Sequence, residues 1–275
     1  MRLIITLLVA TLAITIFSAT SFIPASNNNR ADTLHNHLFT VGIGAGLIGG
    51  LYDGNYSYGL LKQHGNFGLG APDKLDGELV VFQGKIYQTQ YTGKTFVADD
   101  RQLTPFAMVH FFQPDSKTIP GKAMDKQSLF HYLDSILTNV NGLYAIHISG
   151  KFSYIKTRAF PPVKEHEHTP LASMLPLQHF FEFNNVKGDL VGYRLPSYMD
   201  NTNISGYHFH FLSEQKDAGG HIIDVKADSI TIEIDRLDSY TIHIPSTAEF
   251  EQFDFKKTRE DDIKSVERGG KATGK

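Results

Sequence analysis

The sequence contains no cysteine among its 275 residues. Without cysteine the chain has no disulfide, no thiolate nucleophile, no sulfur-ligated metal site and no lipoprotein anchor. An excess of positive charge is also missing, because 26 lysines and arginines face 29 aspartates and glutamates, which gives a formal net charge of −3. We therefore expect no nucleic-acid binding, and any metal ion must be held by nitrogen and oxygen atoms.

The apolar run at residues 3–17 is shorter than the ~20 residues that a membrane-spanning helix needs. It follows Arg2 and precedes small and polar residues, which is the pattern of a secretory signal. We expect residues 1–25 to be a signal peptide, cleaved between Ala19 and Ala25, with export to the periplasm or the medium and no stable membrane association afterwards. An uncleaved membrane anchor is the alternative.

The remaining sequence is that of a packed globular protein, with 41% hydrophobic and 12% aromatic residues. Side-chain periodicity predicts helices at 125–139 and after Thr258, and a strand at 152–158. It also predicts two hairpins, one of strands 78–82 and 85–89 with Gln83-Gly84 as a two-residue turn, and one of strands 230–234 and 240–244. Gly44, Gly46 and Gly49 have the spacing of a dinucleotide-binding loop. No βαβ pattern surrounds them, so we expect close backbone packing rather than a nucleotide cofactor.

Three histidines are the most informative feature. Within Gly-Tyr-His-Phe-His-Phe at residues 206–211, His208 and His210 share one face of a predicted strand. An antiparallel return that sets His221 opposite Leu212 would bring a third imidazole to that face. Three nitrogen ligands with a vacant fourth position are typical of a catalytic zinc site.

Three charged residues stand in positions where the pattern leaves two readings open. Glu78 shares a predicted strand with apolar side chains, so it lies either at an exposed strand end or in a polar site with a partner. Arg158 lies at the tip of a strand, where exposed arginines are common. Glu267 is either a solvated charge or, beside Val266 on a docking helix face, turned inward.

The ordered motifs closely resemble the α-acetolactate decarboxylase family. The matching runs are Leu-Tyr-Asp-Gly at 51–54, His-Gly-Asn-Phe-Gly-Leu-Gly at 64–70, Lys-Leu-Asp-Gly-Glu-Leu at 74–79, Thr-Pro-Phe-Ala at 104–107, Thr-Arg at 157–158, Val-Gly-Tyr-Arg-Leu-Pro at 191–196, the histidine hairpin, and Ile-Lys-Ser-Val-Glu at 263–267. Departures from the family pattern include Ala71 and Asn66, and Ala71 puts a polar contact with substrate in doubt.

The resemblance implies a site and a reaction. His208, His210 and His221 would bind Zn²⁺, and Glu78, Arg158 and Glu267 would be the catalytic side chains. The implied reaction is the decarboxylation of 2-acetolactate, a 2-hydroxy-3-keto acid, to acetoin and CO2. Zinc would stabilise the enediolate and a glutamate would reprotonate it on one face.

The resemblance also implies an α+β fold of two mixed or antiparallel β-sheet subdomains with few helices, and a homodimer. We expect the first subdomain at residues 26–160, contributing Glu78 and Arg158, and the second at 161–257, with the metal site on its hairpin. Residues 258–275 would form a tail that folds back to the site.

Two other functions remain open at this point. Glu214 follows the His-x-His pair, as in a cupin, so a cupin-like oxygenase or isomerase that uses iron or manganese is one alternative. An exported metal-binding module without enzymatic activity is the other.

Overall fold

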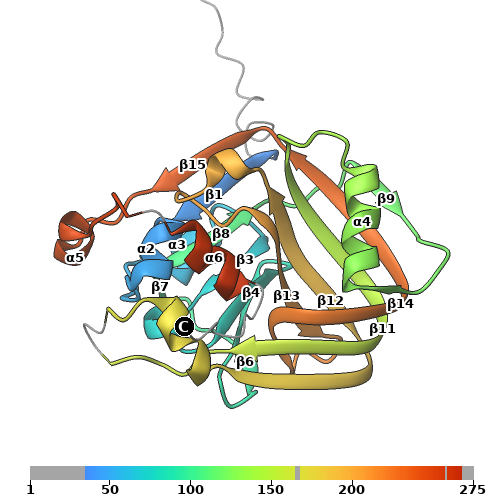
Figure 1. The fold of residues 1–275 in the computed structure, drawn as a ribbon, viewed down its shortest axis with the longest axis horizontal. Coiled ribbons are helices and arrows are strands. Elements are labelled where there is room, and N and C mark those ends of the chain that lie inside the picture. Colours follow the sequence, from blue (N-terminus) through green and yellow to red (C-terminus); the bar gives the residue numbers. More distant parts are fainter. Residues whose placement is uncertain (1–34, 165–167, 258, 268–275) are drawn as a thin grey trace, which may run out of the picture.

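The computed structural model describes residues 35–164, 168–257 and 259–267. Two sheets form the body of the protein, as Figure 1 shows, and the fold is α+β with few helices, as predicted. The first sheet has the order β15-β1-β8-β3-β4-β5-β6, and the second has the order β10-β14-β11-β12-β13, with β9 beside β14. The predicted signal peptide lies outside the described residues. Within them, no helix is long and apolar enough to cross a membrane.

The strands of the first sheet are β1 (His37–Val41), β3 (Phe67–Ala71), β4 (Glu78–Phe82), β5 (Lys85–Thr89), β6 (Thr95–Val97), β8 (Phe106–His110) and β15 (Ser239–His243). Those of the second are β9 (Ser116–Thr118), β10 (Met124–Asp125), β11 (Leu143–Ala159), β12 (His179–Leu195), β13 (Gly206–Ser213) and β14 (Gly219–Leu237). A small sheet pairs β2 (Tyr56–Ser57) with β7 (Leu103–Thr104). The helices are α2 (Gly44–Gly49), α3 (Tyr58–Leu61), α4 (Lys126–Ile136), α5 (Ala248–Gln252), α6 (Glu260–Glu267), η1 (Asp73–Leu75), η2 (Leu171–Leu177) and η3 (Ser197–Met199).

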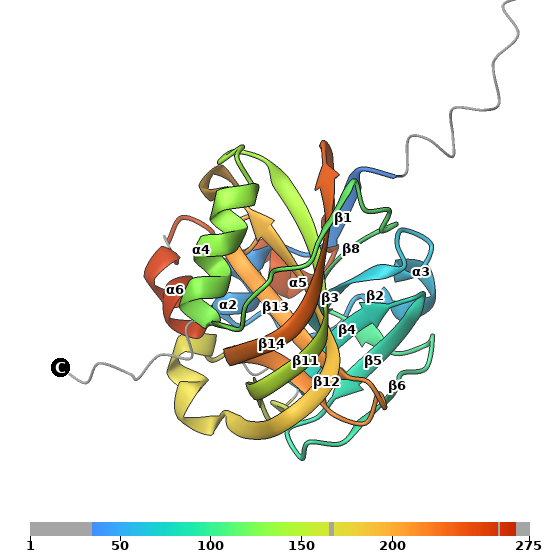
Figure 2. The same ribbon diagram turned by 90° about the vertical axis from the view of Figure 1, so that its right-hand side faces the viewer.

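The two sheets pack face to face over a shared apolar core. Leu69 and Val80 of the first sheet belong to the same buried cluster as Val191 and Leu212 of the second. The second sheet buries its other face under α4, which lies on the outside of that sheet in Figure 2. Both faces of each sheet are covered by apolar layers, so side chains that point to either face are buried. The sequences of the strands are therefore largely hydrophobic.

Local sequence signals account for several elements. Gln83 and Gly84 connect β4 to β5 with φ of 52° and 73°, which is the geometry of a type I′ hairpin turn. Asp125 caps α4 by accepting a 2.8 Å hydrogen bond from the Ser128 N–H. Both the hairpin and this helix confirm the predictions from side-chain periodicity.

Two strands lie in a different sheet from the one expected. β11, placed by prediction at the end of the first subdomain, pairs along its length with β12 and β14 of the second sheet. β15 is not a hairpin partner of β14 but runs parallel to β1 in the first sheet. Asp238 alone separates β14 from β15, which is too short for a hairpin loop. The subdomain boundary near residue 160 stays a prediction.

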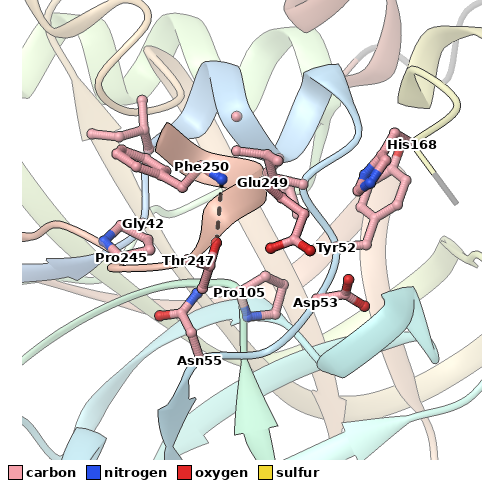
Figure 3. A pocket seen from close by; sticks show the side chains of 14 residues that line it. Gly42, Tyr52, Asp53, Asn55, Pro105, His168, Pro245, Thr247, Glu249 and Phe250 are labelled. Atoms are coloured by element: carbon pink, nitrogen blue, oxygen red, sulfur yellow. Dashed lines mark hydrogen bonds between the residues drawn. The ribbon is translucent and has the colours of Figure 1, made fainter. Parts of the chain in front are cut away.

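The glycines of α2 permit close packing, as expected. A Cβ atom on Gly44 would lie 2.9 Å from backbone atoms of Asn203, and one on Gly49 would overlap the Phe253 ring and the Arg259 guanidinium. The segment that carries α5 crosses α2 here and encloses a cavity, where Thr247 accepts a hydrogen bond from the Phe250 N–H (Figure 3). Leu47 of α2 lines this cavity and also the chamber described next, so α2 is the wall between them.

Candidate metal centre

The histidine hairpin forms with a register two residues from the one predicted. His221 on β14 lies opposite His210 on β13, not opposite Leu212. A shift of two residues preserves the face of every side chain, so the third imidazole still joins the other two. All three histidines are buried on the side that faces the first sheet.

The three rings converge on one point. His208 Nε2 lies 3.2 Å from His210 Nε2 and 3.2 Å from His221 Nδ1. Two imidazole nitrogens bound tetrahedrally at the usual Zn–N distance would lie about 3.3 Å apart. This group is the potential metal-binding cluster among the described residues. The spacing of the nitrogens therefore fits one divalent metal ion.

Hydrogen bonding and burial prepare the rings as neutral ligands. The His210 Nδ1–H donates a 2.7 Å hydrogen bond to the Leu79 carbonyl, which directs the Nε2 lone pair toward the other rings. Burial lowers the pKa of His210 to about 3 and lowers those of His208 and His221 well below the usual range. Neutral imidazole is the form that binds a metal.

Glu78 begins β4 inside the protein, so the polar-site interpretation is correct and the exposed strand end is wrong. Its side chain accepts a 2.8 Å hydrogen bond from an Arg158 Nη, and its other oxygen lies 3.4 Å from His210 Nε2. Burial raises the pKa of Glu78 to about 7, although the Arg158 charge opposes this shift.

Glu267 closes the site from α6. One carboxyl oxygen lies 3.8 Å from His208 Nε2 and 3.7 Å from His221 Nε2, and it has no hydrogen-bond partner within the described residues. The inward orientation arises because Ile263 and Val266 dock in the main core. Burial raises the pKa of Glu267 to about 8, against the Arg158 charge.

Arg158 lies between the two carboxyl groups. One Nη bonds Glu78, and the other donates a 3.4 Å hydrogen bond to the Val266 carbonyl. The guanidinium carbon lies 4.7 Å from the centre of the Phe160 ring, which fixes its plane. Its Nε is buried and has no partner among the described residues, so one donor is available to a ligand.

Comparison with known proteins places the chain in a family. The alpha-acetolactate decarboxylase family model matches residues 38–257. The chain belongs to this family. It is therefore an enzyme of the carboxy-lyase class, and family membership confirms the resemblance of its motifs.

Individual relatives agree with this assignment. The chain is 33% identical to an alpha-acetolactate decarboxylase from Methanosarcina mazei over 91% of this chain and 85% of the relative. It is 31% identical to one from Brevibacillus brevis over 94% of both chains. The crystal structure of alpha-acetolactate decarboxylase from Bacillus subtilis strain 168 aligns with a TM-score of 0.82 at 30% identity, covering 86% of this chain and 100% of that one.

The chamber around the site of this family member is mostly apolar, and of its apolar walls the sequence indicated only Ala71 as a neighbour of the substrate. Its apolar lining comes from α2, η2, strands of the first sheet, the residue after β11 and the loop before β13, and includes Leu47, Ile48, Ala71, Phe106, Phe160, Leu171 and Ile204. Phe106 lies in the Thr-Pro-Phe-Ala motif and Ala71 follows the Gly-Leu-Gly motif, whereas the other lining residues carry no motif of their own. From the sequence, their segments could be expected to be buried, but not to line the chamber.

Glu214, the ligand expected of a cupin, does not belong to the site. It lies in the turn after β13, is exposed, and has its carboxyl oxygen 3.8 Å from Lys187 Nζ. The cupin-like alternative is therefore wrong. The six residues assigned by resemblance are brought together instead, from β4, β11, β13, β14 and α6.

Proposed function

We propose that this chain decarboxylates 2-acetolactate to acetoin and CO2 with a zinc ion held by His208, His210 and His221. The observation that carries the proposal is the meeting of three neutral imidazoles, two buried carboxyl groups and one guanidinium in a single apolar chamber. When bound, zinc would supply Lewis-acid stabilisation to the substrate ketone, where negative charge develops. Nitrogen ligands and buried carboxyl groups are a donor set that suits zinc.

Arg158 is proposed to bind the substrate carboxylate. Its planar guanidinium can form two parallel hydrogen bonds to a carboxylate, and its Nε has no partner in the described structure. Stacking on Phe160 holds the plane of the Arg158 guanidinium, and the hydrogen bond to Glu78 restrains the rotation of this group. The substrate C–C bond would therefore be oriented before CO2 leaves.

Glu267 is proposed to deliver the proton to the carbon that loses CO2. A carboxyl group must be protonated to donate, and burial raises the pKa of Glu267 to about 8. Glu78 is a weaker candidate, because Arg158 bonds its carboxylate and favours the charged form. The two glutamates approach different histidines, so donation by one of them would give acetoin of one hand.

The test is release of CO2 from racemic 2-acetolactate by the zinc-loaded protein, with the chirality of the acetoin recorded by chiral gas chromatography. We expect one enantiomer of acetoin and a stoichiometry of one zinc per chain. If the zinc-loaded protein releases no CO2, the proposed reaction is wrong, and a metal-binding module without activity becomes the better interpretation.

Export and assembly are further proposals. We propose that the chain is secreted after removal of its first residues and that it forms a homodimer. Intact-mass measurement of the protein from the producing cells should show a start between residues 20 and 26, and light scattering should give twice the chain mass. A full-length mass or a monomer would contradict the respective proposal.

A further inference from the structure

An outer cavity lies beside the metal centre. Its walls come from the first two turns of α4, the loop before β13, the start of β13 and α6, and its volume is ≈ 1000 Å³ with the open mouth included. Lys126 and Phe130 contribute from α4, Tyr207 from β13, and Lys264 from α6. Figure 1 shows α4 and α6 approaching the β13 strand from different sides of the second sheet.

Glu267 connects the outer cavity to the chamber. Its side chain lines both spaces, and its carboxyl oxygen lies within 3.8 Å of His208 Nε2. Glu267 therefore stands between a small molecule in the outer cavity and the histidines on this side. The position of the outer cavity is therefore that of an entrance to the chamber that holds the histidines.

Lys126 is fixed at this entrance. Its Nζ donates a 2.8 Å hydrogen bond to the Ile223 carbonyl, two residues after His221 on the same strand. The ammonium also lies 5.7 Å from the centre of the Phe130 ring. Two anchors hold the positive charge beside the strand that carries a metal ligand, and the charge is only partly buried.

The charges that line the entrance are of both signs. Lys126 and Lys264 are positive, and Asp200 and Glu267 are acidic. Asp134 is nearby and accepts a 2.8 Å hydrogen bond from the Tyr207 hydroxyl. Of the two lysines, Lys264 is exposed on α6, whereas Lys126 is half-buried and bonded to the Ile223 carbonyl at the wall of the cavity.

We propose that the outer cavity is the route by which the carboxylate substrate enters and that Lys126 attracts and orients it there as a positioning residue. The inference rests on the proposed function, because that reaction requires an anionic 2-hydroxy acid to enter an apolar chamber. A fixed positive charge at the mouth of a low-dielectric cleft raises the rate of encounter with an anion, and salt weakens the effect.

The experiment compares Lys126→Met with Lys85→Met, a matched loss of charge at the exposed turn of the β4–β5 hairpin. We expect Lys126→Met to lower kcat/KM about threefold to tenfold at low salt with little change in kcat, and to flatten the salt dependence. Lys126→Arg should restore both. Lys85→Met should behave as the unaltered protein, and melting temperatures will show that each variant folds.

A second readout does not depend on turnover. Calorimetric titration of each zinc-loaded protein with lactate, an unreactive 2-hydroxy carboxylate, should show weaker binding for Lys126→Met alone. If Lys126→Met and Lys85→Met agree in lactate affinity and in kcat/KM, the role of Lys126 is wrong. If the unaltered protein releases no CO2 but Lys126→Met alone binds lactate more weakly, the entrance is supported and the proposed decarboxylation fails.

Discussion

An Nη of Arg158 and an oxygen of Glu78 lie 2.8 Å apart, although the residues are 80 positions apart in the chain and belong to different sheets. The pair joins the end of β11, an interior strand of the second sheet, to the start of β4 in the first sheet at the metal centre. Both side chains are buried, with 3% and 10% of the side-chain surface exposed. Such a pair stabilises the fold only while both partners are present.

Replacement of Arg158 by lysine should therefore affect both activity and stability. Lysine cannot form the planar fork, so kcat/KM should fall by about a hundredfold, on the scale of a lost orienting contact. Arg158→Met should in addition lower the free energy of unfolding by about 3 kcal/mol, because Glu78 loses its partner. Urea denaturation and steady-state assays measure these effects, and an Arg158→Met variant with unchanged stability would contradict the coupling.

His208→Ala should remove metal binding. Zinc should raise the melting temperature of the unaltered protein, because a ligand that binds only the native state stabilises it. The variant should show no such shift and should retain no zinc after dialysis in elemental analysis. His131→Ala, an exposed histidine on α4, is the matched control and should behave as the unaltered protein. Zinc retention by His208→Ala would refute the proposed ligand set.

Glu267→Gln should lower kcat by about a hundredfold, because general acid catalysis contributes roughly that factor. The amide is close in size to the carboxyl group and preserves the docking of α6, so the melting temperature should hold. Any residual acetoin should be less enriched in one enantiomer if water replaces the donor. Full turnover with unchanged chirality would assign the proton transfer to another group.

The stability of the metal-free protein should decrease as pH rises from about 6.5 to 8. Burial raises the pKa of Glu78 to about 7 and that of Glu267 to about 8, so the native state holds protons that the unfolded chain has already released. A group with a raised native pKa loses its contribution as pH rises through that pKa. The three histidines, whose pKa values are lowered, act in the opposite direction and only below about pH 6.5.

This pH dependence can be checked by urea unfolding of chelator-treated protein at several pH values. Glu267→Gln should flatten the curve in the upper part of the range. The pH range excludes the titration of free carboxylates, which ionise near pH 4. A curve that does not fall between pH 6.5 and 8 would show that the two glutamates are already ionised in the fold.

Gly49→Ala should disturb the site from a distance. The added methyl group would overlap Phe253 and Arg259, which hold the segment before α6 against α2. We expect a lower melting temperature and weaker docking of α6, with lower kcat. Gly121→Ala is the control, because no atom lies within 4 Å of the added methyl group. Equal melting temperatures for both variants would show that this contact does not hold the segment.

Several features followed from local sequence alone. His208 and His210 lie on the same face of a strand because they are two residues apart. The type I′ turn after Phe82 and the capped helix after Asp125 likewise depend on neighbours within a few residues. The third ligand, His221, was found because a two-residue error in register leaves the face unchanged. The ordered motifs were enough to recognise the family.

Other features were decided by contacts between distant segments. The sequence could not place β15 beside β1, because strand partners in a sheet are chosen by packing and not by local pattern. Nor could it choose between a solvated and a buried Glu78, since its burial depends on Arg158 from a strand of the other sheet. The sequence determined which side chains were available for chemistry and on which faces they lie. The tertiary structure decided which of them share one desolvated chamber, because only the packing of two sheets and α6 removes water from between them.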